Sequence, residues 1–168
     1  MFMYRDFYDL LIRRLKPGDS VVEMGTFYGQ GLIYLAQNTS DVTIYGVDSF
    51  KVSDAPFHPE GYGDEDFYQH VLKNIRDSGT GGTVHLVRGS SPEVADRFED
   101  RSMDCVFIDA AHDEDSVATD IEAWRGKVKP GGILAGDDYI APWGVIPAVD
   151  KKFPDRKLVG QAWWTEVQ

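Results

Sequence analysis

The sequence predicts an α/β fold built on a doubly wound, mostly parallel β-sheet. Short apolar runs rich in Val and Ile alternate with stretches whose apolar residues recur at helical spacing. Runs of this kind suit parallel strands that are covered by helices on both faces. A length of 168 residues and a hydrophobic content of 42% are enough for one core, so we expect a single domain over residues 1–168.

The elements can be placed in order along the chain. An opening helical pattern, in which Phe7, Leu11 and Leu15 recur, stops at Pro17. The strands are expected at residues 20–25, 43–48, 83–89, 103–110 and 131–138. The later helices are expected at residues 30–37, 64–77, 92–98, 114–128 and 145–153. The tail, residues 157–167, fits an antiparallel hairpin around Gly160 at one edge of the sheet.

Composition excludes several classes of function. A net charge of -11 offers no basic stripe for a phosphate backbone, so we expect no nucleic-acid partner. No run approaches the roughly 20 apolar residues of a membrane span. The opening stretch carries Arg5, Asp6 and Asp9 where a secretory signal needs unbroken apolar residues. We therefore expect a soluble, cytoplasmic protein, with the single Cys105 as a buried core thiol.

The ends of the first two expected strands indicate a nucleoside ligand. Gly25 allows a tight turn, Gly29 allows a ligand to approach the backbone, and the next helix presents free N–H groups to an anion. Asp48 follows Gly25 by 23 residues (48 minus 25), close to the offset of roughly 20 residues for an acid that binds ribose. The alternative is a plain glycine turn between a strand and a helix.

The residues around this turn favour one nucleoside over others. Phe27 departs from the G-x-G-x-x-G order of dinucleotide sites, and Glu23 puts a carboxylate near the place of a pyrophosphate. No Lys-Ser/Thr pair follows the glycines, so a triphosphate loop is missing from the pattern. S-adenosylmethionine, which carries adenosine, a cationic centre, an ammonium and one carboxylate, fits better.

Four segments resemble the class I S-adenosylmethionine-dependent methyltransferases. They are "VVEMGTFYGQG", "YGVDSF", "VRGSSPE" and "KPGGILAGDDY", within a resemblance that runs from about residue 19 to 153. It implies a Rossmann-like fold. The cofactor-binding residues expected from it are Glu23, Gly25, Thr26, Phe27, Gly29, Asp48, Ser49, Gly89, Ser90, Ser91 and Asp109.

A narrower resemblance concerns "FIDAAHDED" and "GDDYIAPWGVIPAVDKKF". These segments are similar to the small metal-dependent O-methyltransferases of the macrocin type, which methylate sugar hydroxyls on natural products. The resemblance implies that Asp109, Asp137 and Asp138 bind magnesium and that His112 is the base. Such relatives carry more chain around the substrate. The pocket here is therefore open, closed by the loop at residues 50–63, or completed by another subunit.

Physical reasoning also supports a metal. Asp109 ends one strand and the pair Asp137 and Asp138 ends the next, so three carboxylates converge if these strands are neighbours. Either they hold protons or a cation neutralises them, and hard oxygen ligands favour magnesium, calcium or manganese over zinc. The alternative is that Asp137 caps a loop or helix and Asp138 faces water.

The proposed chemistry follows from the metal, which would stabilise the oxyanion of an alcohol or phenol beside Asp109. His112 is either the base, a metal ligand or a loop histidine that caps the next helix. Trp143 either lines a substrate pocket or packs beneath its loop. Trp163 and Trp164 either cover a sheet edge or contact another subunit, so a homo-oligomer stays open.

We therefore expect an S-adenosylmethionine-dependent O-methyltransferase, assisted by a divalent metal such as Mg²⁺, that acts on a hydroxyl of a small molecule such as a sugar or natural product. A nicotinamide-dependent (NAD) oxidoreductase is a rival that Glu23 and Phe27 disfavour. A non-catalytic nucleoside-binding or oligomerising module is a second rival, and binding alone would not require the acidic cluster. The acceptor and the position of its methylated hydroxyl stay open.

Overall fold

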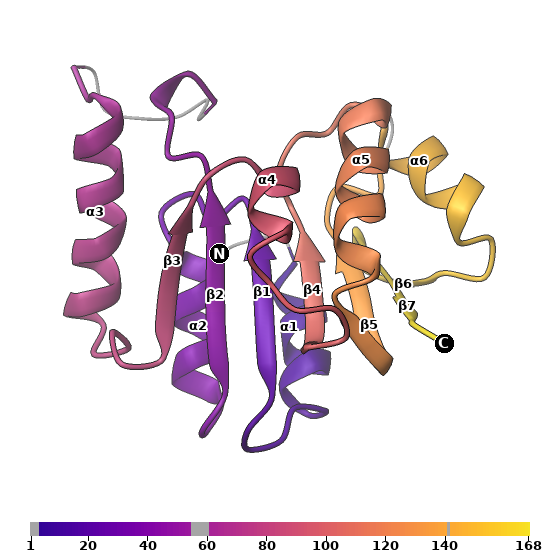
Figure 1. The fold of residues 1–168 in the computed structure, drawn as a ribbon, viewed down its shortest axis with the longest axis horizontal. Coiled ribbons are helices and arrows are strands. Elements are labelled where there is room, and N and C mark those ends of the chain that lie inside the picture. The colour runs from indigo at the N-terminus through magenta and orange to yellow at the C-terminus, as the bar shows by residue number, and fades with distance from the viewer. Residues whose placement is uncertain (1–3, 55–60, 141) are drawn as a thin grey trace.

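The computed structural model describes residues 4–54, 61–140 and 142–168 and shows a seven-stranded sheet with helices on both faces (Figure 1). The strands are β1 (Ser20–Met24), β2 (Thr43–Asp48), β3 (Val84–Arg88), β4 (Met103–Ile108), β5 (Val128–Gly136), β6 (Lys157–Val159) and β7 (Ala162–Glu166). The helices are α1 (Arg5–Ile12), α2 (Gln30–Asn38), α3 (Asp64–Asp77), α4 (Ser91–Ala95), α5 (Glu114–Arg125) and α6 (Val145–Lys152), with a 3₁₀ turn at Val52–Asp54.

The strand order is β3-β2-β1-β4-β5-β7-β6, which confirms the predicted fold class. The first five strands pair in parallel, whereas β7 pairs antiparallel with both β5 and β6. The expected hairpin around Gly160 is therefore present. The chain reverses its direction of travel between β3 and β4, so the carboxyl ends of β1 and β4 form the switch point where ligands bind in folds of this kind.

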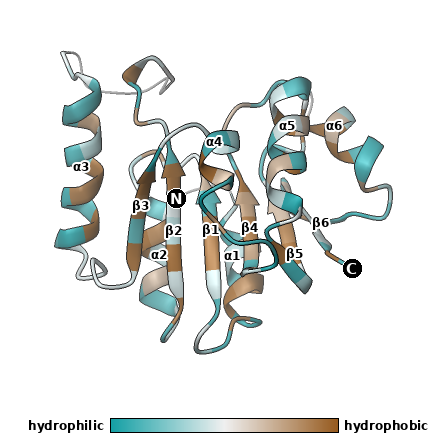
Figure 2. Ribbon diagram, viewed as in Figure 1, coloured by the Kyte–Doolittle hydropathy of each residue, from teal (hydrophilic) through white to brown (hydrophobic). Residues whose placement is uncertain are grey.

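Two hydrophobic layers cover the two faces of the sheet. Successive residues of a strand point to opposite faces, so Val21 and Cys105 pack with α1, α2 and α3, whereas Val22 and Val106 pack with α4, α5 and α6. Figure 2 shows the central strands mostly apolar and the helices mixed in character. Cys105 is fully buried, and burial raises the pKa of its thiol, which supports the expected core role.

Most element boundaries agree with the sequence prediction to within two residues, whereas the ends of two helices and the start of β5 differ by three. The helix expected over 114–128 ends at Arg125, and Val128 belongs to β5, where it pairs with Met103. Val128 continues the apolar face of α5 in sequence, so helical spacing alone extends the helix too far. The helix expected over 92–98 is shorter, at Ser91–Ala95, because Phe98 leaves it to contact Trp124 at 5.2 Å between ring centroids.

Two further expectations concern loops and membranes. Residues 55–60, which include His58 and the centre of the loop expected at 50–63, lie outside the described residues. Within the described ranges, no helix combines the length and the apolar composition that crossing a bilayer requires.

Candidate active site

The turn after β1 brings two strand ends into close contact. Gly25 has φ of +79°, and a Cβ atom there would lie 1.7 Å from the backbone oxygen of Asp109. The Asp109 N–H donates to the Met24 carbonyl at 3.0 Å. Only glycine fits this position, because its lack of a side chain allows both the left-handed φ and the close approach. Gly29 is the N-cap of α2, so the whole turn lies at the carboxyl edge of the sheet.

Asp48, at the end of β2, holds the same turn through its carboxylate. Oδ2 accepts from the backbone N–H groups of Thr26 at 2.9 Å and Phe27 at 3.2 Å, and Oδ1 accepts from the Phe50 N–H at 2.7 Å. Burial raises the pKa of Asp48, and these hydrogen bonds oppose the rise. Ser49 follows it and accepts from the Lys51 N–H at 3.2 Å. Asp48 therefore shapes the turn and keeps a lone pair of Oδ1 for a further donor.

The segment after β3 lies next to Asp48 and over β1. The Gly89 N–H donates to the Asp48 carbonyl at 3.0 Å, and Ser90 is the N-cap of α4. The Ser91 hydroxyl lies 3.0 Å from the sulfur of Met24. The structure thus brings Gly89, Ser90 and Ser91, which were predicted to bind the cofactor, to the same sheet edge as the glycine turn. Their contacts with a cofactor stay predictions.

Glu23 is turned toward α1. Its side chain is fully buried, and its carboxylate accepts from the hydroxyls of Tyr4 at 3.0 Å and Tyr8 at 2.9 Å. Burial raises its pKa from 4.5 to about 8, with a further rise from the nearby charge of Asp109. Glu23 therefore links the end of β1 to the start of α1. A direct contact with the cofactor stays a prediction.

Acidic side chains converge where β4 and β5 end. These strands are neighbours, as expected, with Ile108 paired to Gly136. His112 Nε2 lies 3.0 Å from Asp138 Oδ2 and 3.6 Å from Asp109 Oδ1. One ligand atom from each of Asp109, His112 and Asp138 lies within 4.8 Å of the others. The arrangement is small enough to surround one cation.

Asp137 does not belong to this group of three. It is 5% exposed, and its Oδ1 atom is buried with no hydrogen-bond partner among the residues described. Burial first and the charge of Asp109 second raise its pKa to about 7. A buried carboxylate oxygen without a donor is costly, so a positively charged group beside it would be stabilising. The carboxylates of Asp109 and Asp138 offer the hard oxygen ligands that a divalent cation prefers. The predicted ligand set of three Asp residues is thus brought together only in part.

His112 supplies positive charge at the centre of the group. The carboxylates of Asp109 and Asp138 raise the pKa of its imidazole to about 10, and burial raises the pKa of Asp109 to about 6. The 3.0 Å contact of Nε2 with Asp138 lacks hydrogen-bond geometry, so the attraction between the two is chiefly one of charge. His112 thus lies where a metal ion would bind.

A network of hydrogen bonds and an ion pair connects the residues after β5 to α6. Asp138 has φ of +54°, a strained value for a residue other than glycine. The hydroxyl of Tyr139 donates to Asp150 of α6 at 2.6 Å and accepts from Arg156, which also forms an ion pair with Asp150 at 2.8 Å. This network holds Tyr139 and thereby positions its neighbour Asp138. The sequence did not predict it, because no local pattern pairs Tyr139 with residues 11 and 17 positions away.

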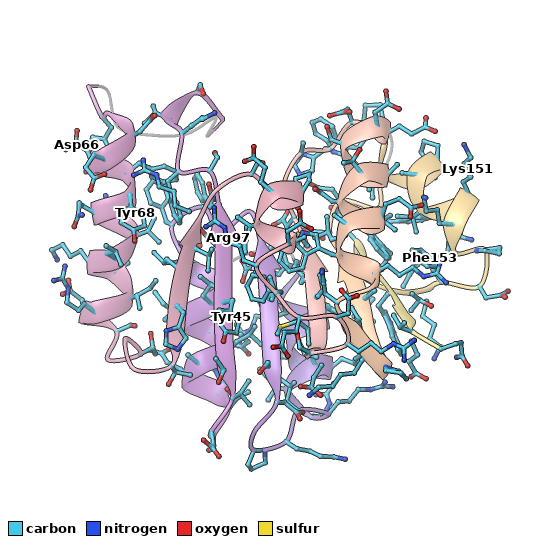
Figure 3. All side chains as sticks on the ribbon, viewed as in Figure 1. Tyr45, Asp66, Tyr68, Arg97, Lys151 and Phe153 are labelled. Atoms are coloured by element: carbon cyan, nitrogen blue, oxygen red, sulfur yellow. The ribbon has the colours of Figure 1, made fainter. Side chains whose placement is uncertain are left out.

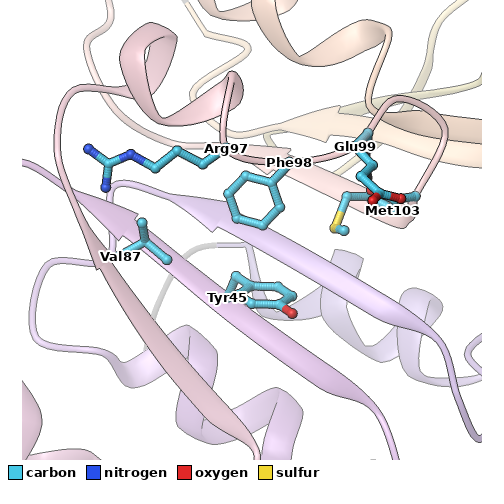
Figure 4. A pocket seen from close by; sticks show the side chains of 7 residues that line it. Tyr45, Val87, Arg97, Phe98, Glu99 and Met103 are labelled. Carbon is cyan, nitrogen blue, oxygen red and sulfur yellow. Dashed lines mark hydrogen bonds between the residues drawn. The ribbon is translucent and has the colours of Figure 1, made fainter.

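A separate hollow of about 370 Å³ lies on the sheet face beside α4 (Figure 4). Its lining residues are Tyr45, Val87, Arg97, Phe98, Glu99, Ser102 and Met103. None of the predicted site residues is among them. The hollow is therefore distinct from the strand ends that carry the acidic group.

Comparison with known proteins identifies the class. A family model described as a methyltransferase domain matches residues 22–139, which include the Gly25 turn, Asp48, Asp109 and Asp138. The chain belongs to this methyltransferase family. Its fold is that of class I S-adenosylmethionine-dependent methyltransferases, as the sequence predicted.

A curated relative is similar over most of the chain. It is the uncharacterized protein R132 of Acanthamoeba polyphaga mimivirus, 29% identical over 147 residues that cover 83% of this chain. The matched part spans 62% of the length of that protein.

Solved structures share the fold at low sequence identity. A candidate O-methyltransferase from Klebsiella pneumoniae has a TM-score of 0.70 and 18% identity, over 97% of this chain and 79% of that one. The cofactor-bound protein Rv0187 from MTB has a TM-score of 0.70 and 18% identity, over 96% and 78% of the two chains. At these identities the similarity shows the fold alone.

The burial of Glu23 predicts a pH-dependent stability. Because its pKa rises from 4.5 to about 8, the folded protein keeps a proton that the unfolded chain releases between these values. The free energy of unfolding attributable to Glu23 therefore falls as pH rises through this window. We expect Glu23→Gln to make the fall less steep in urea unfolding measured from pH 5 to pH 8. The exposed Glu99→Gln should follow the parent, and parallel profiles for Glu23→Gln and the parent would contradict the burial argument.

The position of Asp48 predicts a loss of cofactor affinity on substitution. Asp48→Ala removes a charged acceptor and releases the backbone N–H groups of Thr26 and Phe27. Calorimetric titration should show S-adenosylhomocysteine binding weakened by about 1 to 3 kcal/mol. Asp48→Asn, which keeps one oxygen acceptor, should lose less. An unchanged affinity in a folded Asp48→Ala variant would remove this residue from the binding site.

Proposed function

We propose that the chain is an O-methyltransferase that uses S-adenosylmethionine, with the help of a divalent metal ion, to methylate a hydroxyl of a small molecule. The observation that carries the proposal is the convergence of Asp109, His112 and Asp138 at the carboxyl ends of β4 and β5, next to the Gly25 turn. When bound, S-adenosylmethionine supplies an electrophilic methyl group. The family match and this acidic centre favour methyl transfer over the nicotinamide-dependent alternative.

Asp109 and Asp138 would hold the metal, and ligation by Asp137, whose Oδ1 lies outside their group, stays a prediction. The metal would act as a Lewis acid that stabilises the oxyanion of the acceptor. The positive charge of His112 and a divalent cation compete for the same two carboxylates. Binding of the ion should therefore free the imidazole from its two contacts.

His112 is proposed as the group that takes the proton of the acceptor hydroxyl. Its Nε2 atom lies within 3.6 Å of both carboxylates, so an imidazole that the ion displaces from them would stay beside the acceptor hydroxyl that they orient. The Gly144 N–H donates to the His112 carbonyl at 2.9 Å, so the backbone of this residue is fixed although its side chain is partly exposed. A base needs such a fixed position within reach of the acceptor.

The metal predicts a stabilisation that depends on Asp138. Magnesium at a hundredfold excess over its dissociation constant should raise the free energy of unfolding of the parent by about 2.7 kcal/mol relative to chelator. Asp138→Asn removes one charged ligand, so its melting temperature should rise less with magnesium. Melting curves of both proteins with magnesium and with chelator measure the difference.

Asp115→Asn, at an exposed acid in the first turn of α5, is the matched control and should keep the full response. An equal magnesium response in Asp138→Asn and the parent would exclude Asp138 as a ligand. If neither protein responds, the metal is not part of the function and a metal-independent methyltransferase is the better proposal.

A further inference from the structure

Exposed apolar side chains lie along the sheet edge that carries the candidate active site. Among the described residues, the large hydrophobic side chains that are exposed are Phe27 (39%), Ile140 (39%), Trp143 (47%) and Leu158 (49%). Phe27 follows β1, and Ile140 and Trp143 follow β5, so three of the four lie at the sheet edge that carries the acidic group. Scattered exposed apolar residues are ordinary, but Ile140 and Trp143 lie within five residues of Asp138, and apolar surface beside a polar centre is typical of a ligand-binding site.

Trp143 is the member of this set that contacts the acidic group. Its ring lies 5.3 Å from the ring of His112, between centroids, at an interplanar angle of 56°. His112 in turn contacts Asp109 and Asp138. The exposed part of the indole is therefore one side chain away from the carboxylates that would orient the acceptor.

The backbone fixes Trp143 in this position. The Trp143 N–H donates to the Ile140 carbonyl at 3.1 Å, and the next residue, Gly144, donates to His112. A Cβ atom on Gly144 would lie 2.2 Å from the backbone nitrogen of Glu114, so this turn is pressed against the start of α5. The fixed backbone and the ring contact with His112 both restrain the indole, so binding a ligand costs this side chain less entropy.

Negative charge surrounds the same edge. The first turn of α5, which directly follows the loop of His112, carries Glu114 and Asp115, and the first turn of α4 carries Glu93. Farther along the edge, the first turn of α3 carries Asp64, Glu65 and Asp66, of which Glu65 forms an ion pair with Arg88 at 3.0 Å. Figure 3 labels Asp66 in the first turn of α3, on the side of the sheet away from α5 and α6. Charges of one sign around a binding site attract ligands of opposite charge and repel those of the same charge. An anionic acceptor is therefore disfavoured.

We infer that the acceptor is an aryl alcohol or phenol without negative charge, whose ring lies against Trp143 while its hydroxyl faces Asp109 and Asp138. The inference rests on the proposed function and adds the substrate class. An aromatic ring stacks on the exposed indole, and a cationic substituent gains from the acidic edge. A free sugar offers less apolar area to Trp143 and should bind more weakly.

Four probes test the inference by calorimetric titration with magnesium present, with and without S-adenosylhomocysteine. Three are phenols of matched size: 4-(2-aminoethyl)phenol is cationic, 4-ethylphenol is neutral and 4-hydroxyphenylacetate is anionic. The fourth is methyl glucoside. At low salt we expect the anionic phenol to bind about tenfold or more weakly than the cationic one, with a gap that shrinks as salt is added. Methyl glucoside should bind more weakly than the neutral phenol.

Variants locate the binding surface. Trp143→Ala should weaken binding of the neutral phenol about tenfold, and Trp143→Phe, which keeps an aromatic ring, should restore most of it. Leu158→Ala is the matched control, because Leu158 is equally exposed but lies on β6, and it should bind like the parent. Both positions are exposed, so the melting temperatures should stay close to that of the parent.

Several outcomes would overturn the inference. These are an unchanged phenol affinity in Trp143→Ala, equal binding of the glucoside and the neutral phenol, equal binding of the anionic and cationic phenols, or no phenol binding by a protein that binds S-adenosylhomocysteine. The last outcome leaves the proposed methyl transfer standing. Failure to bind S-adenosylhomocysteine itself would instead count against the proposed function, and phenol binding without the cofactor would still support the surface at Trp143.

Discussion

The close contact between the ends of β1 and β4 is the constraint on which the candidate active site depends. The Asp109 N–H donates to the Met24 carbonyl, and the Gly25 turn has no room for a Cβ atom beside Asp109. The contact places the predicted cofactor turn and the first acid of the acidic group side by side. Asp48 then closes the turn from β2, and Asp138 joins Asp109 from β5. Methyl donor and acceptor would therefore meet at one switch point of the sheet.

Local sequence patterns predicted most of the fold. Apolar runs ending in Gly or Asp located the five parallel strands to within three residues, because burial on both faces requires such runs. The start of β5 was wrong, since Val128 fits both the apolar face of a helix and a strand paired with Met103. The sequence pattern cannot separate these two, because the pairing depends on a partner 25 residues away (128 minus 103). Local patterns do not predict the order of the strands in the sheet, and that prediction required the family resemblance as well.

The sequence predicted those parts of the candidate site whose position depends only on where a strand ends. Neighbouring parallel strands bring their carboxyl ends together, so the meeting of Asp109 and Asp138 followed from topology. The direction of each side chain could not be predicted from the topology of the sheet. Glu23 turns to Tyr8 of α1 and to Tyr4, the N-cap of that helix. Asp137 lies outside the group that its neighbour Asp138 joins, because adjacent residues at a strand end point different ways. The contact of His112 with both carboxylates depends on a loop whose conformation no periodic pattern encodes.

The distribution of charge links the stability of the protein to its proposed chemistry. Glu23, Asp109 and Asp137 all have raised pKa values, with burial as the largest cause, and lie near one sheet edge. A structural core gains nothing from three such carboxyls, because each resists ionisation and holds a proton at some cost to stability at higher pH. A bound positive charge would stabilise the ionised form of these three carboxyls, which explains why they are grouped. On the proposed function, the sulfonium of the cofactor and a divalent ion supply that charge, so binding should release protons and stabilise the fold together.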